Sequence, residues 1–425
     1  MNGVNVNGDI LPNDWQPMPL GSLLREVNCK VGRSGNTDVP ILSMTRHQGL
    51  ILQSDKFEKR VASRDISSYK LVQENQIVVG FPIDEGVIYA LRRFPLGAVS
   101  PAYQVWELIS NVIDVSFLDR MLKTPYMLER YRQLSSLTVQ RRRSVGKQDF
   151  LSISIPVPPL PEQRRISAVL NTIQDAIAAQ EDVIAAAKEF KRSLMHRLFT
   201  VGPGREPAPT KETEIGEIPA HWEVAPLSEA ISETQYGLNS RAELAGTYPV
   251  LRMNNLVAGK IDISDLKYVE LEPDELSRYR LNRDDILFNR TNSYELVGKT
   301  ALFDQKDIYT FASYLVRVVA KTSKAVPAYL NSVLNAEHTQ QRLKRLATRG
   351  ASQSNISPTK LKTLLVALPP VPEQEQMTEM LDAADSKIAA EEDRLTALQA
   401  LFKSMLHQLM TGQIRLLSDE GLPLA

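Results

Sequence analysis

A direct repeat constrains the fold of this chain more than any other feature of its 425 residues. The segment PPLPEQ at 158–163 returns as PPVPEQ at 369–374, 211 positions later, and the match continues without a gap to Thr200 and Thr411. Upstream of these motifs the two halves match more weakly, beginning near Trp15. Self-similarity at a fixed offset predicts two copies of one structural unit. Each copy is a globular head followed by a long helix.

The stretch after each motif has the pattern of one uninterrupted helix. Between the opening prolines, Pro161 and Pro372, and the glycines Gly202 and Gly412, neither stretch contains Pro or Gly, and Pro suits a first helical position. Apolar residues recur four and three positions apart over more than four heptads, which indicates a coiled-coil seam. We expect two helices of about 39 residues, each about 58 Å long, to pair with each other. Separate packing of each amphipathic helix on its own head remains the alternative.

The heads mix short strands with helices, so the predicted fold class is α+β. Runs rich in β-branched residues at 76–81, 285–290 and 314–320 predict strands. Helices are predicted at 124–134 and 327–347. A Pro/Gly-rich stretch is typical of an exposed linker, and a short terminal tail is typically loosely held. The predicted order is head one (1–160), first helix (161–200), linker (201–219), head two (220–371), second helix (372–411) and tail (412–425).

Composition limits the possible functions. Lys plus Arg and Asp plus Glu both number 50, so the net charge is zero. Because nucleic-acid binders are usually basic, neutrality counts against DNA binding unless charge is segregated locally or supplied by a partner. The single cysteine, Cys29, excludes a disulfide framework or a cysteine-based zinc site and indicates a reduced, cytoplasmic protein. The sequence has no apolar run of about 18 residues, so no membrane-spanning helix is predicted.

Motifs for catalysis are missing from the sequence. It contains no GxxxxGK[ST] phosphate loop, no GxGxxG fingerprint, no GxSxG elbow and no Asn-Pro-Pro-aromatic segment. The histidines lack metal-ligand spacing. We therefore expect no enzyme activity, no cofactor and no metal in this chain.

Polar clusters in the heads carry side chains suited to DNA. Arg pairs bidentately with guanine and Asn or Gln with adenine, while basic and hydroxyl groups hold phosphates. Each cluster alone can be a solvated loop, but the clusters fall at corresponding places in the two halves. The predicted DNA contacts of head one are Thr45, Arg46, His47, Gln48, Arg92, Arg141, Arg142, Arg143 and Lys147. Those of head two are Arg252, Asn254, Asn255, Asn289, Arg290, Thr291, Asn292, Arg349, Gln353 and Ser354, of which Arg252, Asn254, Asn289, Arg290 and Asn292 should share one exposed concave face.

Taken in order, the segments of this chain resemble the specificity subunits of type I restriction–modification systems. The two PPxPEQ motifs carry the resemblance, together with FEKRVASRDISSYKLV (57–72), IGEIPAHWEVAPL (215–227) and YRLNRDDILFNRTNSYELVGKTALF (279–303). The likeness covers nearly the whole chain. Head one departs from it at 80–93, where GFPIDEGVIYALRR lacks the Asn-Arg-Thr-Asn-Ser run of head two.

This resemblance implies a function. Each head would be a target recognition domain that reads one half of a bipartite, asymmetric site in double-stranded DNA, and the long helices would form an antiparallel coiled coil that sets the spacer. Two modification subunits would methylate adenine with S-adenosylmethionine after base flipping. Two restriction–translocase subunits would use ATP and magnesium, so every cofactor belongs to a partner. A stand-alone or degenerate DNA-binding or antagonist protein of the same fold, and an enzyme with an unrecognised site, remain the alternatives.

Two polar residues interrupt the seam at equivalent positions, Gln180 and Glu391. Each lies at the middle of its helix, so in an antiparallel pair they should face each other. A Gln amide can donate to a Glu carboxylate, and polar seam residues fix register. In the alternative, both side chains point to solvent.

The basic cluster of head one leads to a prediction about phosphates. Neutralising two of the residues Arg141, Arg142, Arg143 and Lys147 should reduce the slope of log K against log[salt] by about 2, because each phosphate contact releases about one counterion. Binding to one duplex over a series of salt concentrations measures the slope. An unchanged slope would identify the cluster as a solvated loop.

Overall fold

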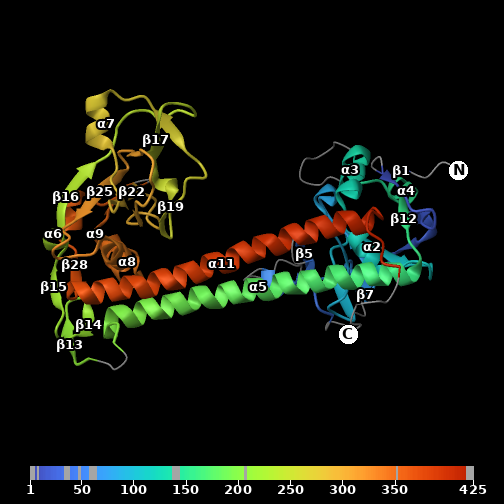
Figure 1. The fold of residues 1–425 in the computed structure, drawn as a ribbon. Helices are drawn as coiled ribbons and strands as arrows, with labels where there is room; N and C mark the ends of the chain where they lie inside the picture. Colours follow the sequence, from blue (N-terminus) through green and yellow to red (C-terminus); the bar gives the residue numbers. More distant parts are fainter. Residues whose placement is uncertain are drawn as a thin grey trace. The chain divides into compact units, whose positions relative to one another are not determined.

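The computed structural model describes residues 5–6, 9–32, 39–45, 49–56, 65–135, 144–204, 208–350 and 353–417. It divides into two compact units: residues 1–181 with 393–425 form unit 1, and residues 182–392 form unit 2. Two long helices, α5 (Leu160–Val201) and α11 (Val371–Met410), each contribute one half to each unit (Figure 1). Each unit therefore contains one head and one half of each long helix.

Unit 1 contains mostly short elements before α5. Its helices are α1 (Gln53–Lys56), α2 (Val115–Met121), α3 (Pro125–Leu134) and α4 (Lys147–Ser152), with 3-10 turns at Leu20–Ser22 and Ile83–Glu85. Its strands are β1 (Asn5–Val6), β2 (Asp9–Ile10), β3 (Gln16–Pro19), β4 (Leu24–Val27), β5 (Leu42–Thr45), β6 (Gly49–Leu52), β7 (Lys70–Gln73), β8 (Ile77–Val79), β9 (Ile88–Ala90), β10 (Leu96–Val99), β11 (Gln104–Leu108) and β12 (Ser154–Val157).

The core of unit 1 lies between an antiparallel sheet, in the order β4–β11–β8–β9, and the helices α2, α3 and α4. Trp106 and Phe150 are fully buried, with ring centroids 5.4 Å apart. Ile166 at the start of α5 and Leu409 near the end of α11 belong to the same buried cluster. Burial of the apolar stripe of each helix end against a head is what anchors the long helices in this unit.

Unit 2 contains the more extensive sheet. Its short helices are α6 (Leu227–Ala230), α7 (Pro273–Tyr279), α8 (Pro327–Asn335), α9 (Glu337–Leu346) and α10 (Pro358–Lys362), with a 3-10 turn at Met253–Asn255. Its strands are β13 (Thr210–Thr213), β14 (Gly216–Pro219), β15 (Glu223–Pro226), β16 (Ile231–Tyr236), β17 (Tyr248–Leu251), β18 (Leu256–Val257), β19 (Gly259–Ile261), β20 (Lys267–Val269), β21 (Ile286–Asn289), β22 (Thr291–Asn292), β23 (Thr300–Leu302), β24 (Thr310–Phe311), β25 (Leu315–Ala320), β26 (Thr348–Arg349), β27 (Ser354–Asn355) and β28 (Leu365–Leu368).

The main sheet of unit 2 has the order β16–β25–β21–β23–β19–β18. Every residue of β21 is buried, as expected for a central strand that is covered on both faces. In the figure, α8 and β28 lie beside the start of α11, whereas α7 lies at the far edge of the head (Figure 1). Leu198 of α5 and Met377 of α11 share the core cluster of this sheet.

Within unit 2 the two helix halves run antiparallel. Lys188 Nζ lies 2.7 Å from Glu392 Oε1, and Lys191 Nζ lies 2.6 Å from Asp385 Oδ1. From Lys188 to Lys191 the chain advances along α5, while the paired residue moves back along α11 from Glu392 to Asp385. Only antiparallel helices allow this order. Charged residues beside an apolar seam fix the orientation of paired helices in this way.

The polar seam residues are buried. Gln180 is 5% exposed and Glu391 is 8% exposed, and Lys387 Nζ lies 2.6 Å from Glu391 Oε1. The alternative in which both side chains point to solvent is therefore wrong. Gln180 belongs to unit 1 and Glu391 to unit 2, so their face-to-face contact stays a prediction.

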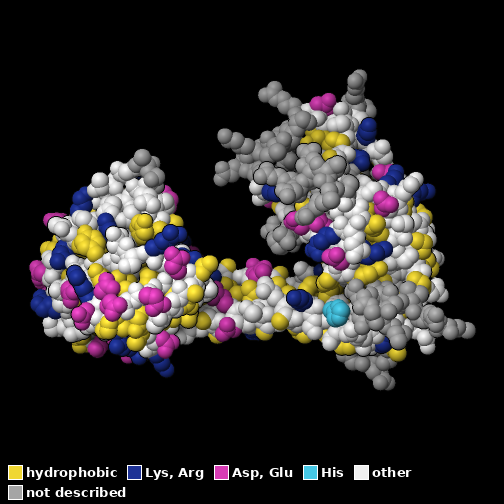
Figure 2. Space-filling view, turned by 90° about the horizontal axis from the view of Figure 1, so that it is seen from above, with side chains coloured by type: hydrophobic (Ala, Val, Ile, Leu, Met, Phe, Trp, Pro, Cys, Tyr) yellow, Lys and Arg dark blue, Asp and Glu magenta, His cyan; other side chains and the backbone are white. Residues whose placement is uncertain are grey.

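Charges of both signs are interspersed on the surface of head two. Figure 2 shows Lys and Arg side chains next to Asp and Glu side chains over the visible face of this head, with no continuous basic field. Residues 220–371 contain 19 Lys and Arg and 16 Asp and Glu, so head two has a net charge of only +3. DNA affinity of this face has to come from particular side chains rather than from an extended positive potential.

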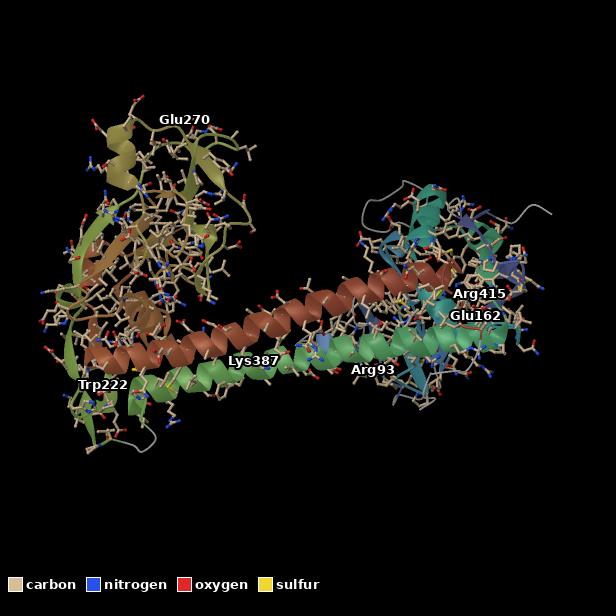
Figure 3. All side chains as sticks on the ribbon, viewed as in Figure 1. Arg93, Glu162, Trp222, Glu270, Lys387 and Arg415 are labelled. Carbon is tan, nitrogen blue, oxygen red and sulfur yellow. The ribbon has the colours of Figure 1, made fainter. Side chains whose placement is uncertain are left out.

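The Glu of each PEQ motif anchors the opening tryptophan of its head. Trp15 Nε1 donates to Glu162 Oε2 at 3.2 Å, and Trp222 Nε1 donates to Glu373 Oε2 at 2.9 Å. Figure 3 labels Glu162 and Trp222, which lie at the starts of α5 and α11. The strand after each tryptophan pairs with the strand before each motif: β3 with β12, and β15 with β28. The repeat therefore encodes one device that closes each head onto its helix.

The Gln of each motif completes this device. Gln163 Nε2 donates to the carbonyl oxygens of Val112 and Pro158, both at 2.8 Å, and its Oε1 accepts from Asp114 N at 2.7 Å. Its counterpart is fully buried and bonds in the same pattern. A single side chain thus satisfies backbone groups that would otherwise be buried without partners.

Parts of the described linker and tail make contacts that the sequence did not predict. Within 201–219, strands β13 and β14 form a hairpin whose Ile218 is buried in the core. In the tail, Arg415 Nε donates to Glu162 Oε1 at 2.8 Å, and Arg415 Nη2 lies 2.6 Å from Asp14 Oδ2 (Figure 3). The exposure predicted for the linker holds for most of β13 but is wrong for Ile218, which packs in the core. A loose tail is wrong for Arg415, which binds Glu162 and Asp14.

The PEQ device leads to a stability prediction. Gln374→Ala should lower the free energy of unfolding by about 3 kcal/mol, because Val326 N and the carbonyl groups of Lys324 and Pro369 lose their partner. Urea unfolding measures the change. The control is Gln376→Ala, which alters an exposed residue of the same helix and should cost less than about 0.5 kcal/mol. Equal losses for the two variants would contradict the assigned role.

Candidate nucleic-acid interface

The termini of three strands of head two lie side by side at one end of its main sheet, which we call the reading edge. β16 ends at Tyr236, β21 ends at Asn289, and β25 begins directly after Tyr314. Tyr236 pairs with Val316 and Asn289 with Leu315, so the three ends are adjacent. Tyr236 and Tyr314 are 49% and 45% exposed. This edge therefore presents aromatic rings to solvent on a rigid framework.

Arg290 leaves the end of β21 and is held over this edge. Its backbone N–H donates to the Tyr314 carbonyl oxygen at 3.1 Å, and its Nη1 donates to the Ser313 carbonyl oxygen at 3.1 Å. The guanidinium carbon lies 4.9 Å from the ring centroid of Tyr236. A guanidinium held by a ring and one hydrogen bond keeps further donors for an acceptor outside the protein.

A small antiparallel sheet continues from Arg290. Thr291 of β22 pairs with Asn355 of β27, and β27 pairs with β26. Asn355 Nδ2 donates to Thr291 Oγ1 at 2.7 Å. We call this sheet with its flanking side chains the ribbon surface, defined as Tyr236, Arg290, Thr291, Asn292, Tyr294, Thr348, Arg349 and Gln353. Its residues are half-buried or exposed, and their chemistry suits base edges and phosphates.

The family model for the type I restriction modification DNA specificity domain matches residues 12–189 and 221–400. The chain belongs to the type I restriction–modification DNA specificity family. Among its relatives, the MjaVIII specificity subunit of Methanocaldococcus jannaschii is 26% identical over 427 residues, covering 96% of this chain and 95% of that protein. A putative MjaX specificity subunit of the same organism is 34% identical over 204 residues, which span 47% of this chain and 48% of that relative.

Solved structures share the fold of this specificity-family chain. The S subunit of a type I restriction–modification system from M. genitalium is 13% identical, with a TM-score of 0.55 over 96% of this chain and 99% of that one. A chain from a study of complex assembly and conformational transition of the type I R-M system is 14% identical, with a TM-score of 0.60 over 95% and 99%. At these identities the likeness concerns the fold alone.

Three residues predicted to contact DNA are buried in this specificity-family chain. Asn289, Asn255 and Ser354 are 0%, 1% and 4% exposed. Asn255 accepts from Arg252 N and donates to the carbonyl oxygens of Asp262 and Asp265, so it braces a loop. The predicted base contacts of these three residues, and a common exposed face that includes Asn289, are therefore wrong. The Asn255 amide serves the backbone, and Asn289 Nδ2 donates to the Leu296 carbonyl oxygen at 3.4 Å, because buried amides need partners.

The first polar cluster of head two is held by an acidic residue. Arg252 Nη2 lies 2.9 Å from Asp265 Oδ2, and Asn254 Nδ2 donates to the same oxygen at 3.0 Å. Both side chains remain partly or fully exposed, but the carboxylate offsets the charge of Arg252. Asp265 was the signal that sequence reasoning missed, since nothing local indicates that it folds back onto this cluster.

Head one presents different chemistry at the corresponding edge. Where head two has Arg290 beside Tyr314, head one places the Phe81 and Tyr103 rings with centroids 6.0 Å apart. Lys70 Nζ donates to the Tyr103 carbonyl oxygen at 2.6 Å. Burial, and secondarily the charge of Lys30, lower the pKa of Lys70. Lys30 pairs with Lys70 in an isolated β-bridge, and sequence reasoning selected neither lysine.

Most predicted contacts of head one are not placed. Arg46, His47, Gln48, Arg141, Arg142 and Arg143 lie outside the described residues. Thr45 is half-buried, and its Oγ1 donates to the Gly49 carbonyl oxygen at 3.3 Å. Arg92 is exposed, whereas Lys147 forms an ion pair with Glu26. The Glu26 carboxylate thus offsets the one charge of the basic cluster that the structure describes.

Unit 2 also contains a groove of about 1000 Å³ between the helix halves and head two. Lys188, Lys191 and Lys260 line it, but Glu392 and Asp385 lie within 4 Å of their ammonium groups. These matched charges do not make an anion site. Within the described ranges, no group of three His, Cys, Asp or Glu residues is placed to hold a metal, and no helix is long and apolar enough to cross a membrane.

Proposed function

We propose that this chain reads a bipartite DNA site, one half with each head, and leaves the chemistry to partner subunits. The observation that carries this proposal is the ribbon surface of head two, in a chain of the type I DNA specificity family. Side chains there combine bidentate donors with rings on a rigid sheet edge, as sequence readout requires. The different edge of head one, with Phe81 and Tyr103, fits a different half-site.

We further propose that the long helices pair antiparallel over their full length and set the spacing of the half-sites. Each helix is continuous, and the ion pairs of unit 2 fit this direction. A shift of one heptad would displace a head by about 10 Å, which is about three base-pair steps of 3.4 Å. The buried Gln180 and Glu391 would fix the register against such a shift.

The partners in this proposal are two modification subunits and two restriction–translocase subunits. S-adenosylmethionine, ATP and magnesium belong to those partners, and this chain is non-catalytic. Two exposed apolar residues support paired docking: Phe190 of α5 is 62% exposed and Leu401 of α11 is 47% exposed. They are repeat equivalents, 211 positions apart, and neither belongs to the apolar seam. A single exposed apolar side chain is common on a protein surface, so the support comes from its recurrence at equivalent positions of the repeat.

Docking at these two residues predicts a change of stoichiometry. Phe190→Asp or Leu401→Asp alone should leave one modification subunit bound, and the double variant should leave none, because each charge blocks one apolar contact. Native mass spectrometry of the assembled complex counts the subunits. Gln399→Asp adds the same charge at an exposed position on another side of α11 and should keep both subunits. Unchanged stoichiometry in the double variant would place docking elsewhere.

Reading by head two predicts a change in one half-site. With the methyltransferase partner present, Arg290→Ala should weaken binding of specific DNA by about 1–3 kcal/mol and relax base preference in one half only. Arg283→Ala, an exposed arginine before the opposite end of β21, is the control. Sequencing of the DNA sites methylated in the host supplies the specific duplex. Equal weakening on all sequences would identify Arg290 as a phosphate contact. Tight specific binding without any partner would favour the stand-alone alternative.

A further inference from the structure

We propose that Arg349, held on the ring of Tyr294, reads a guanine through the major groove, and that Tyr294 is its positioning residue. This inference rests on the proposed role of head two as a DNA reader. It adds the base that is read, the element that carries the reader and a residue that sequence reasoning did not select.

Arg349 has an open donor edge. Its guanidinium carbon lies 4.1 Å from the ring centroid of Tyr294. Within the described part of the chain, its guanidinium forms no hydrogen bond or ion pair. Arg349 is also exposed, in contrast to half-buried Arg290 and Arg252. A guanidinium stacked on a ring keeps its N–H donors in the plane of the fork, available to an external acceptor.

The other two predicted arginines are already engaged. Arg290 donates from Nη1 to the Ser313 carbonyl oxygen, and its Nε is buried without a hydrogen-bond partner among the described residues. Arg252 donates to the backbone and carboxylate oxygens of Asp265. Because a bidentate contact needs two parallel N–H donors, Arg349 is the arginine of this set that offers the whole fork without first breaking a contact.

The backbone around Arg349 has the shape that the major groove accepts. Arg349 pairs with Ser354, Thr348 pairs with Asn355, and Gly350 N donates to the Gln353 carbonyl oxygen at 2.8 Å, so β26 and β27 form a hairpin. Lys360 Nζ donates to Thr348 Oγ1 at 2.9 Å and braces the strand from α10. β26 is the outer strand of the three-stranded sheet β22–β27–β26. The major groove admits a β-ribbon, and there guanine presents the acceptors N7 and O6 side by side.

Tyr294 is itself held in place. It lies in the turn after β22, where Leu296 N and Val297 N donate to the Ser293 carbonyl oxygen. Lys344 Nζ lies 5.9 Å from the Tyr294 ring centroid and 3.4 Å from Glu295 Oε2. A ring that is fixed before DNA binds reduces the rotamer freedom that Arg349 loses on binding. The ring, rather than its hydroxyl, does the positioning.

The experiment uses the full chain in complex with its methyltransferase partner and a duplex library with both half-sites randomised. Sequencing of the bound pool gives the preference at each position. We expect a guanine at one position of one half-site in the wild-type pool. Arg349→Ala and Arg349→Lys should both reduce that preference, by about five- to a hundred-fold, and leave the other half-site unchanged. Lysine keeps the charge but cannot form the bidentate fork.

The positioning role is tested by a conservative pair. Tyr294→Phe should keep the guanine preference, whereas Tyr294→Leu should weaken it at the same position without changing the others. Arg283→Ala, an exposed arginine three residues before β21, should keep every preference. Circular dichroism of each variant checks the fold, and Arg349→Lys keeps the test valid if Tyr294→Leu does not fold.

The outcomes separate this inference from the proposed function. A wild-type pool without any enriched bipartite site contradicts the proposed function itself. An enriched site that Arg349→Ala and Arg349→Lys both leave unchanged overturns the assignment of Arg349 alone. Uniform weakening by Arg349→Ala with recovery in Arg349→Lys also overturns it, because that result identifies a phosphate contact.

Discussion

The Glu–Gln pair at the start of each long helix is the interaction on which the rest of the structure depends. Glu162 is 2% exposed and receives hydrogen bonds from Trp15 and Arg415. Gln163 ties the end of the head to the helix through three backbone groups. A buried carboxylate is costly unless it is paired and hydrogen-bonded, so the partners must be present together. In unit 2 Glu373 is half-buried, but the hydrogen bonds of the Glu to the opening tryptophan and of the Gln to the backbone recur, and they account for a motif that returns almost unchanged at 369–374.

The same attachment serves two heads with different edges. In unit 2, Glu373 accepts from Trp222 and lies 2.7 Å from His221 Nε2, whereas in unit 1 the additional donor is Arg415 of the tail. Above these shared attachments, head two presents Arg290 on Tyr236, and head one presents the Phe81–Tyr103 pair. The attachment of head to helix is the same in both units, and the residues at the reading edges take no part in it. Substitutions at one reading edge can therefore change the half-site of that head without affecting the attachment.

Charge neutrality of the chain has a structural counterpart in how its cations are held. Acidic residues form ion pairs with Arg252, Lys147, Lys188 and Lys191, so these charges contribute little to a long-range electrostatic field. Arg290 and Arg349 instead lie on tyrosine rings, which stabilise a guanidinium without offsetting its charge. The proposed DNA contact therefore relies on a few oriented side chains, and the partner subunits would supply the remaining electrostatic attraction.

The sequence by itself determined the duplication, the two long helices, and the strands β8, β21 and β25, because apolar periodicity and the opening prolines are local properties. Tertiary structure decided the fate of the polar residues. Asn289 is buried, Asp265 forms an ion pair with Arg252, and Glu162 forms an ion pair with Arg415, more than 250 positions away. It also divided the predicted helix at 327–347, where extended Ala336 separates α8 from α9 without Gly or Pro. The physical reason is that a hydrogen-bonding side chain takes whichever partner the fold brings within about 3 Å, and that partner is rarely a neighbour in sequence.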